Sequence, residues 1–204
     1  IGELIERWDG FGKMKGEGLT KRSIMYWVKQ DAYEAYKKVR YNSVEYYLEL
    51  SLKSINLENA TSKNSRGCGD YDIALVLHQL FKDEYVCVDL KSNKWYRFRN
   101  HRWELIDSGT TLRKAISNEL RDMYNVKAQS LFSLANVGDP ESEPNRAIKC
   151  RANKILDLCT RLARTSDKNN IMTEAKELFW DPTFLDKIDA NTEFEPFAPA
   201  VPAG

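Results

Sequence analysis

The stretch YVCVDLKSNKWYRFRNHRWELIDSGTTLRKAISNEL, residues 85–120, decides the fold of this 204-residue chain. Three runs in it are rich in aromatic and β-branched residues, as strands are. They cover residues 85–90, 95–98 and 103–106, and short polar segments that can turn separate them. The spacing predicts a three-stranded antiparallel meander over about residues 85–106.

The two-residue period of a strand divides the middle run between two faces. Trp95, Arg97 and Arg99 fall on one face, and Tyr96 and Phe98 fall on the other. We therefore expect one face of the sheet to pack while the other carries charge. The two tryptophans and their aromatic neighbours are expected to hold the arginine-bearing turn in place.

A helix is predicted directly after the meander. Asp107 to Thr111 offers several side chains that can cap a helix, and apolar residues then follow at helical spacing. These apolar residues are Leu112, Ile116, Leu120 and Met123. The helix should begin near Thr111.

The rest of the chain reads as helical. Residues 23–39 fit either one long helix or a helix-turn-helix, and Asn42–Ser43 can cap a helix over 44–57. Further helices are expected over 73–81 with Asp70 as cap, after Pro144, and over 171–179 with Asn169 or Asn170 as cap. The fold class is therefore α+β, mainly α-helical with one small three-stranded antiparallel meander, and a winged-helix-like core is one candidate.

Polar and small residues suggest how the chain is divided. Residues 59–69 are rich in Gly, Ser and Asn and are expected to link a helical segment, 1–58, to a domain over 70–195. Residues 196–204 form a Pro/Ala tail. Because the chain opens at Ile1 without methionine and ends in this tail, we expect a piece of a longer protein.

Charge is balanced overall but unevenly placed. The net charge is +1, yet residues 91–127 carry nine Lys/Arg against four acids, and residues 146–168 carry seven against two. The part after Asn169 is acidic. A general polyanion binder is therefore excluded, and any nucleic-acid surface must be local.

The sequence lacks the usual signs of several protein classes. It has neither a signal segment nor an apolar run long enough for a membrane, so a soluble protein is expected. Its four cysteines have neither zinc-site nor disulfide-framework spacing, which predicts reduced thiols. It has no phosphate-loop motif, and His78 and His101 are its only histidines. We expect no catalytic residue, no metal and no cofactor in this chain.

Basic and aromatic residues gather at the second turn of the meander. Cations there can bind phosphates and aromatic rings can stack on bases. The candidate nucleic-acid-binding residues are Lys94, Arg97, Arg99, His101, Arg102 and, on the next helix, Arg113. A solvated hairpin whose aromatic residues belong to the core is the alternative.

The block from Trp95 to Trp103, followed by Asp107–Gly109, Leu112–Arg113 and Ile116–Ser117, resembles a known family. It is similar to the domain that precedes the superfamily 3 helicase module in primase-helicases of large DNA viruses of the poxvirus, asfarvirus and giant-virus type. The likeness extends over residues 70–195. Residues 16–36 resemble the helical domain at the C-terminal side of archaeo-eukaryotic-type primases.

The resemblance implies a non-catalytic connector or collar that supports a hexameric ring and guides single-stranded or forked DNA toward an ATP-driven helicase. The partners implied are other copies of the chain and the adjoining primase and helicase domains, with no membrane. ATP and Mg²⁺ are expected for the parent protein only, and the host cytoplasm is the expected location. A protein–protein interaction module of a replication complex, without DNA contact, is the alternative.

Overall fold

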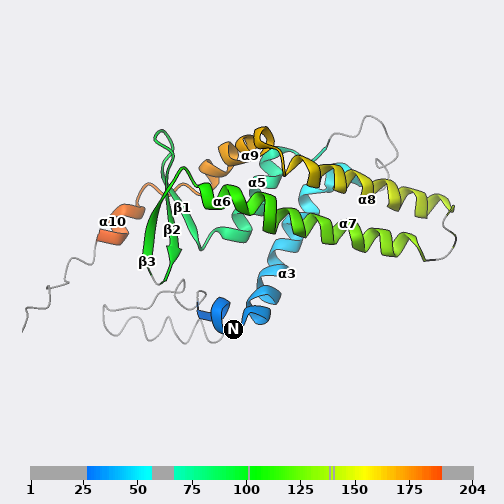
Figure 1. The fold of residues 1–204 in the computed structure, drawn as a ribbon, viewed down its shortest axis with the longest axis horizontal. Coiled ribbons are helices and arrows are strands. Elements are labelled where there is room, and N and C mark those ends of the chain that lie inside the picture. The colour runs from blue at the N-terminus through cyan, green and yellow to red at the C-terminus, as the bar shows by residue number, and fades with distance from the viewer. Residues whose placement is uncertain (1–26, 57–66, 101, 138, 140, 190–204) are drawn as a thin grey trace, which may run out of the picture.

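The computed structural model describes residues 27–56, 67–100, 102–137, 139 and 141–189. A helical turn over 27–31 precedes the named elements. These are α3 (Tyr33–Ser51), η1 (Lys53–Ile55), α5 (Asp70–Phe81), β1 (Tyr85–Asp89), β2 (Lys94–Arg99), β3 (Arg102–Asp107), α6 (Thr110–Ala115), the π-helical turn η2 (Ile116–Leu120), α7 (Arg121–Ala135), α8 (Glu143–Arg161), α9 (Thr165–Leu178) and α10 (Phe184–Asp189). The sheet lies at one end of an elongated molecule, and the hairpin of α7 and α8 projects at the other (Figure 1).

The predicted meander is confirmed. The strands are antiparallel in the order β1-β2-β3, and β2 pairs with β3 from Lys94 opposite Asp107 to Arg99 opposite Arg102. Both turns contain an asparagine with positive φ, 54° at Asn93 and 50° at Asn100. Asparagine tolerates this left-handed conformation better than most residues, which explains where the chain can reverse.

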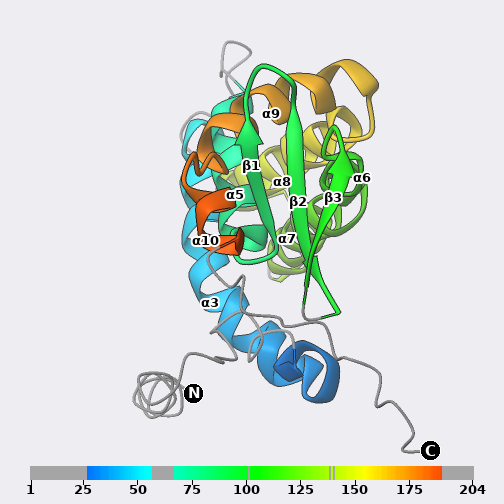
Figure 2. The ribbon, with the colours of Figure 1, turned by 90° about the vertical axis from the view of Figure 1, so that its left-hand side faces the viewer.

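The expectation of one packed and one charged sheet face is wrong, because both faces are covered. Trp95, on the face expected to carry charge, is fully buried toward the helical core and lies 5.6 Å from the ring of Phe179. On the opposite face, α10 brings Phe184 to within 5.6 Å of the Tyr96 ring and 4.7 Å of the Trp103 ring. Figure 2 shows α10 in front of the sheet and the other helices behind it.

The outer edge of β1 is also covered. Cys87 donates its backbone N–H to the carbonyl of Phe179 at 2.9 Å, and Asp181 donates to the carbonyl of Cys87 at 3.0 Å. The chain leaving α9 therefore adds a short bridge to the sheet before it turns into α10. This return holds α10 over the outer sheet face.

The helix predicted near Thr111 begins at Thr110, and its backbone stays helical through η2 to Ala135. Ser108 and Gly109 before it both have positive φ, 50° and 63°. A Cβ at Gly109 would lie 2.9 Å from Met172 and 3.2 Å from the Trp95 ring. Glycine thus permits both the turn and the close approach to the indole.

Three helix boundaries differ from the expectation. α3 runs through Asn42–Ser43 without a break, and the interruption lies at Ala32 instead, where φ is −140° and ψ is 55°. α9 begins at Thr165, four or five residues before the expected cap at Asn169 or Asn170, because Arg164 takes the extended N-cap conformation. α5 begins at Asp70 itself, after Gly69.

One hydrophobic core joins residues on both sides of the expected linker. Leu48 of α3 and Leu52, the residue after this helix, are buried in the same cluster as Ile73 of α5 and Ile155 of α8. Most of the expected linker, residues 59–66, lies outside the part of the chain that the structure describes. The domain boundary there stays a prediction.

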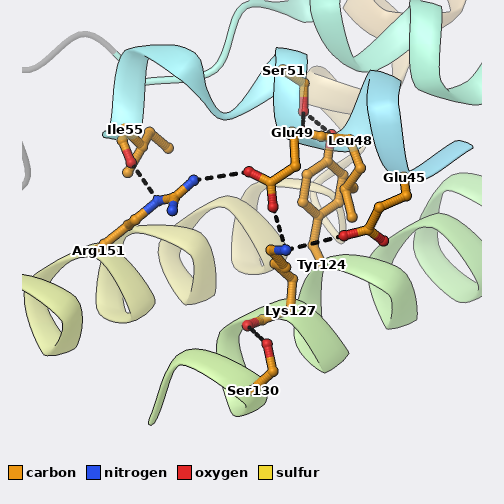
Figure 3. A network of polar contacts seen from close by, with 9 residues as sticks. All are labelled: Glu45, Leu48, Glu49, Ser51, Ile55, Tyr124, Lys127, Ser130 and Arg151. Atoms are coloured by element: carbon orange, nitrogen blue, oxygen red, sulfur yellow. Dashed lines mark hydrogen bonds and ion pairs between the residues drawn. The ribbon is translucent and has the colours of Figure 1, made fainter. Parts of the chain in front are cut away.

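A polar network joins α3 to the base of the α7–α8 hairpin (Figure 3). Lys127 of α7 forms ion pairs with Glu45, at 3.1 Å, and with Glu49. Arg151 of α8 binds the other oxygen of Glu49 at 3.1 Å and donates Nε–H to the carbonyl of Ile55 at 2.8 Å. These contacts fix the direction in which the hairpin leaves the body.

Candidate nucleic-acid interface

The predicted nucleic-acid-binding residues do not form one cluster. Arg99 and Arg102 lie at the tip of the β2–β3 hairpin, whereas Lys94 lies at the other end of β2, about 17 Å away for a strand of this length. Arg113 follows that second end on α6, and His101 is outside the described residues. Of the described positions, Arg99 and Arg102 therefore lie at one end of the sheet, Lys94 and Arg113 at the other, and Arg97 between them.

Arg99 and Arg102 form a pair of like charges at the hairpin tip. They are directly opposite each other in the strand register, and both side chains are exposed. Arg102 donates Nε–H to Glu104 at 3.3 Å, but its side chain remains 75% exposed. Like charges opposite each other destabilise a sheet, so this pair does not help the hairpin to fold. An anion between the two guanidinium groups would remove the repulsion.

Arg97 has a structural role at the inner end of this hairpin. Its guanidinium lies over the Tyr85 ring at 5.3 Å and 4.0 Å from a carboxylate oxygen of Glu84. Glu84 also accepts hydrogen bonds from Lys29 at 2.6 Å and from the Tyr36 hydroxyl at 3.4 Å. Burial raises the pKa of Tyr85, which keeps its hydroxyl neutral beside this group. Arg97 is thus held within the protein.

Lys94 and Arg113 have different surroundings. Lys94 is exposed, and its ammonium lies 6.0 Å from the centre of the Tyr96 ring. Arg113 donates Nε–H to the side-chain oxygen of Asn169 at 3.0 Å and Nη2–H to the carbonyl of Thr165 at 3.5 Å. Arg113 therefore belongs to the corner between α8 and α9 and not to the hairpin tip.

Arg113 belongs to a group of cations that we call the basic corner, which consists of Arg113, Lys114, Arg164 and Lys168. The acid nearest in sequence, Asp167, is already paired with Arg161 at 3.1 Å. Sequence reasoning noted the basic window over 146–168 but did not join it to Arg113, because about 50 residues separate the two. The contact between Arg113 and α9 brings them together.

Acid–base and metal chemistry find little support in the described part of the chain. It contains no group of three His, Cys, Asp or Glu side chains that could hold a metal ion. Burial lowers the pKa of His78, whose ring packs edge-on against Phe179 at 4.8 Å. Burial also raises the pKa of Cys68 to about 12 and that of Cys159 to about 11, which makes both poor nucleophiles.

None of the described helices is long and apolar enough to cross a membrane. The surface carries scattered apolar side chains and many charged ones. The basic hairpin tip and the basic corner are the features that most suggest a ligand.

Residues 74–202 match the family model described as D5 N terminal like. The chain belongs to this family. It is similar to "Putative helicase L207/L206" of Acanthamoeba polyphaga mimivirus, with 28% identity over 178 residues, which are 87% of this chain and 17% of that protein. It is also similar to "Putative helicase 022R" of Frog virus 3 (isolate Goorha), with 26% identity over 154 residues, which are 62% of this chain and 16% of that protein.

These comparisons confirm the family predicted from residues 95–117. The D5 N terminal-like match begins inside α5, at residue 74, and includes the meander and every later element. The chain spans about a sixth of the length of the viral helicases it resembles. Both arginines of the hairpin tip and all four cations of the basic corner lie within the D5 N terminal-like part.

Proposed function

We propose that this D5 N terminal-like region is a non-catalytic connector of a viral DNA-replication helicase. It links a primase part to a helicase part, supports assembly of a hexameric ring, and guides single-stranded or forked DNA toward the ATP-driven motor. ATP and Mg²⁺ belong to the helicase part of the longer protein, which acts in the host cytoplasm. The helicase names of the two viral relatives support this proposal, as does the small share of their length that the chain covers.

The arginine pair at the hairpin tip is the observation that carries the DNA role. Arg99 and Arg102 project from a turn whose strands are anchored on both faces, so the tip is held firmly while the charges stay exposed. Arginine binds DNA phosphates whatever the base sequence. This suits a protein that must guide DNA without recognising particular bases. Lys94, exposed at the other end of β2, can add a phosphate contact farther along the strand.

Binding of fluorescein-labelled oligo-dT, followed by anisotropy at several salt concentrations, tests this role. The double variant R99Q/R102Q should reduce the slope of log affinity against log salt by about 1.4, because each lost phosphate contact on a single strand removes about 0.7. The control is K53Q/R146Q, which removes two exposed cations elsewhere on the molecule. An unchanged slope in R99Q/R102Q, or an equal loss in the control, would refute the assignment.

A protein–protein interaction module is the second candidate function. The exposed Leu134 and Val137 on the projecting hairpin favour it, because the described core does not use them. If the wild-type chain and the longer protein both fail to bind DNA at low salt, this second function replaces the first.

A further inference from the structure

The α7–α8 hairpin ends in a surface with unused apolar and acidic groups. Leu134 is 57% exposed and Val137 is 71% exposed. The turn that follows carries Asp139 and Glu141, α8 begins with Glu143, and the next cation in the sequence is Arg146. We call Leu134, Val137 and these three acids the acidic tip.

Asp139 accepts the backbone N–H of Glu141 at 3.0 Å and so helps to order the turn, but the other side chains of the acidic tip add little to the packing of the hairpin. Small and apolar side chains between the two helices, including Ala128, Leu131 and Ala152, are already buried. Glu141 and Glu143 have no ion pair with any residue in the described ranges. Figure 1 shows the hairpin extending beyond the rest of the fold, so the tip faces away from the body.

The basic corner has the opposite character and lies at the other end of α8. Arg164 and Lys168 are one helical turn apart, and Arg113 reaches them from α6 through Asn169 and Thr165. From Glu143 to Arg161, α8 is about 27 Å long at 1.5 Å per residue. The tip of one molecule therefore cannot touch its own corner.

We propose that the acidic tip of one copy docks on the basic corner of a second copy. The contact would pair the carboxylates of the tip with cations that have no carboxylate partner within the described structure, and it would cover Leu134 and Val137. The inference rests on the proposed role in assembling a hexameric ring, and it names the two surfaces that would meet between neighbouring copies. DNA bound at the basic corner is the competing outcome.

The two surfaces differ, so the proposed contact joins the tip of one copy to the corner of another. Each copy offers one tip and one corner at separate places, and such contacts close into a ring or continue as a filament. A two-fold dimer would instead need the tip of each copy to reach the corner of the other at the same time. The polar network at the base of the hairpin fixes the direction of the tip and hence the angle between neighbours (Figure 3).

Zero-length carbodiimide cross-linking of the whole chain tests the contact directly. The reagent joins a carboxylate to a lysine amine only when the two touch. We expect cross-linked peptides between Glu141 or Glu143 and Lys114 or Lys168, identified by mass spectrometry. In a mixture of ¹⁵N-labelled and unlabelled protein these peptides should carry both isotopes, which proves that they join two molecules.

Two charge-reversal variants make the test decisive. E141K/E143K alters the tip and R164E/K168E alters the corner, and each alone should lose at least tenfold of the cross-linked product. Mixed together, they bring an intact tip to an intact corner and a reversed, positive tip to a reversed, negative corner, so cross-linked species should return, dimers among them. Circular dichroism of each variant establishes that it is folded.

Three results would overturn the inference. They are absence of tip-to-corner peptides in the wild-type chain, cross-linking that survives both reversals, and failure of the mixture to form dimers. If oligo-dT abolishes the wild-type cross-links, the corner belongs to DNA and the inference also fails. The salt dependence of R99Q/R102Q is independent of these results, so the DNA role and the docking surface can fail separately.

Discussion

Replacing Glu49 by glutamine should weaken the joint between α3 and the α7–α8 hairpin. Glutamine keeps the shape of the side chain but removes the charge that Lys127 and Arg151 share. Lys127 would keep its ion pair with Glu45, and Arg151 its hydrogen bond to the Ile55 carbonyl, but both would lose the carboxylate that they share. The matched control is E45Q, since Glu45 forms an ion pair with Lys127 but, among the described side chains, not with Arg151, and is 48% exposed.

The magnitude follows from the contacts and their exposure. A hydrogen bond to a charged group contributes about 1.5–3 kcal/mol when it is well shielded. Glu49 is 39% exposed, so solvent screening reduces the sum of its two contacts to about 1–2 kcal/mol. For E45Q the same reasoning gives a loss in the free energy of unfolding of about 0.5 kcal/mol or less.

The effect should depend on pH in a definite direction. Burial alone would raise the pKa of Glu49, but Lys127 and Arg151 outweigh it and lower the pKa below its ordinary 4.5. A carboxyl with a lowered folded-state pKa stabilises the protein fully above its unfolded-state pKa and loses that contribution as the pH falls through its folded-state pKa. The cost of E49Q should therefore be largest at neutral pH and shrink in acid.

Urea unfolding followed by circular dichroism, at neutral pH and at stepwise lower pH, measures this. We expect E49Q to lower the free energy of unfolding by about 1–2 kcal/mol at neutral pH and by progressively less below pH 4.5. Equal costs for E45Q and E49Q, or a cost for E49Q that does not change with pH, would refute the reasoning.

Two further predictions concern a backbone turn and the thiols. G109A should lower the free energy of unfolding by about 2–4 kcal/mol, because the left-handed conformation costs about 1–2 and the contacts with the indole and Met172 add to it. S108G, at the neighbouring positive φ, should instead be neutral or stabilising, and a loss as large as that of G109A would contradict the explanation. At pH 8, Cys68 and Cys159 should react with a thiol reagent roughly 1000-fold and 100-fold more slowly than in urea, as their pKa values of about 12 and 11 against the ordinary 9.0 require. Rapid labelling of either thiol in the folded chain would show that the pKa is not raised.

Local chemistry made part of this fold predictable. The strands of the meander follow from β-branched and aromatic runs, and Asn93 and Asn100 mark its turns because asparagine accepts positive φ. The start of α6 follows from Ser108 and Gly109 in the same way. Such features depend on residues close in sequence.

The errors came from contacts between distant segments. Alternation along β2 placed Trp95 correctly beside Arg97, but it could not show that α5 and α9 would bury that face or that α10 would cover the other. The cap at Asn169 failed for a similar reason, since that side chain accepts a hydrogen bond from Arg113 instead.

The candidate site shows the same division. The exposed arginine pair of the hairpin tip is a property of one turn, and sequence reasoning found it. The basic corner forms only where α6, α8 and α9 lie together in the fold. The sequence therefore indicated its separate basic segments but not that they are close in space. Whether either surface binds DNA stays a prediction.

The uninterrupted helix from Thr110 to Ala135 gives the molecule a lever. It starts beneath the sheet and ends near the acidic tip, about 38 Å away at the usual rise per residue. A tilt of about 5° at the sheet would therefore move the far end by about 3 Å, which is the length of a hydrogen bond. A small displacement of the β2–β3 hairpin would thus make or break a contact at the acidic tip, at the opposite end of the molecule.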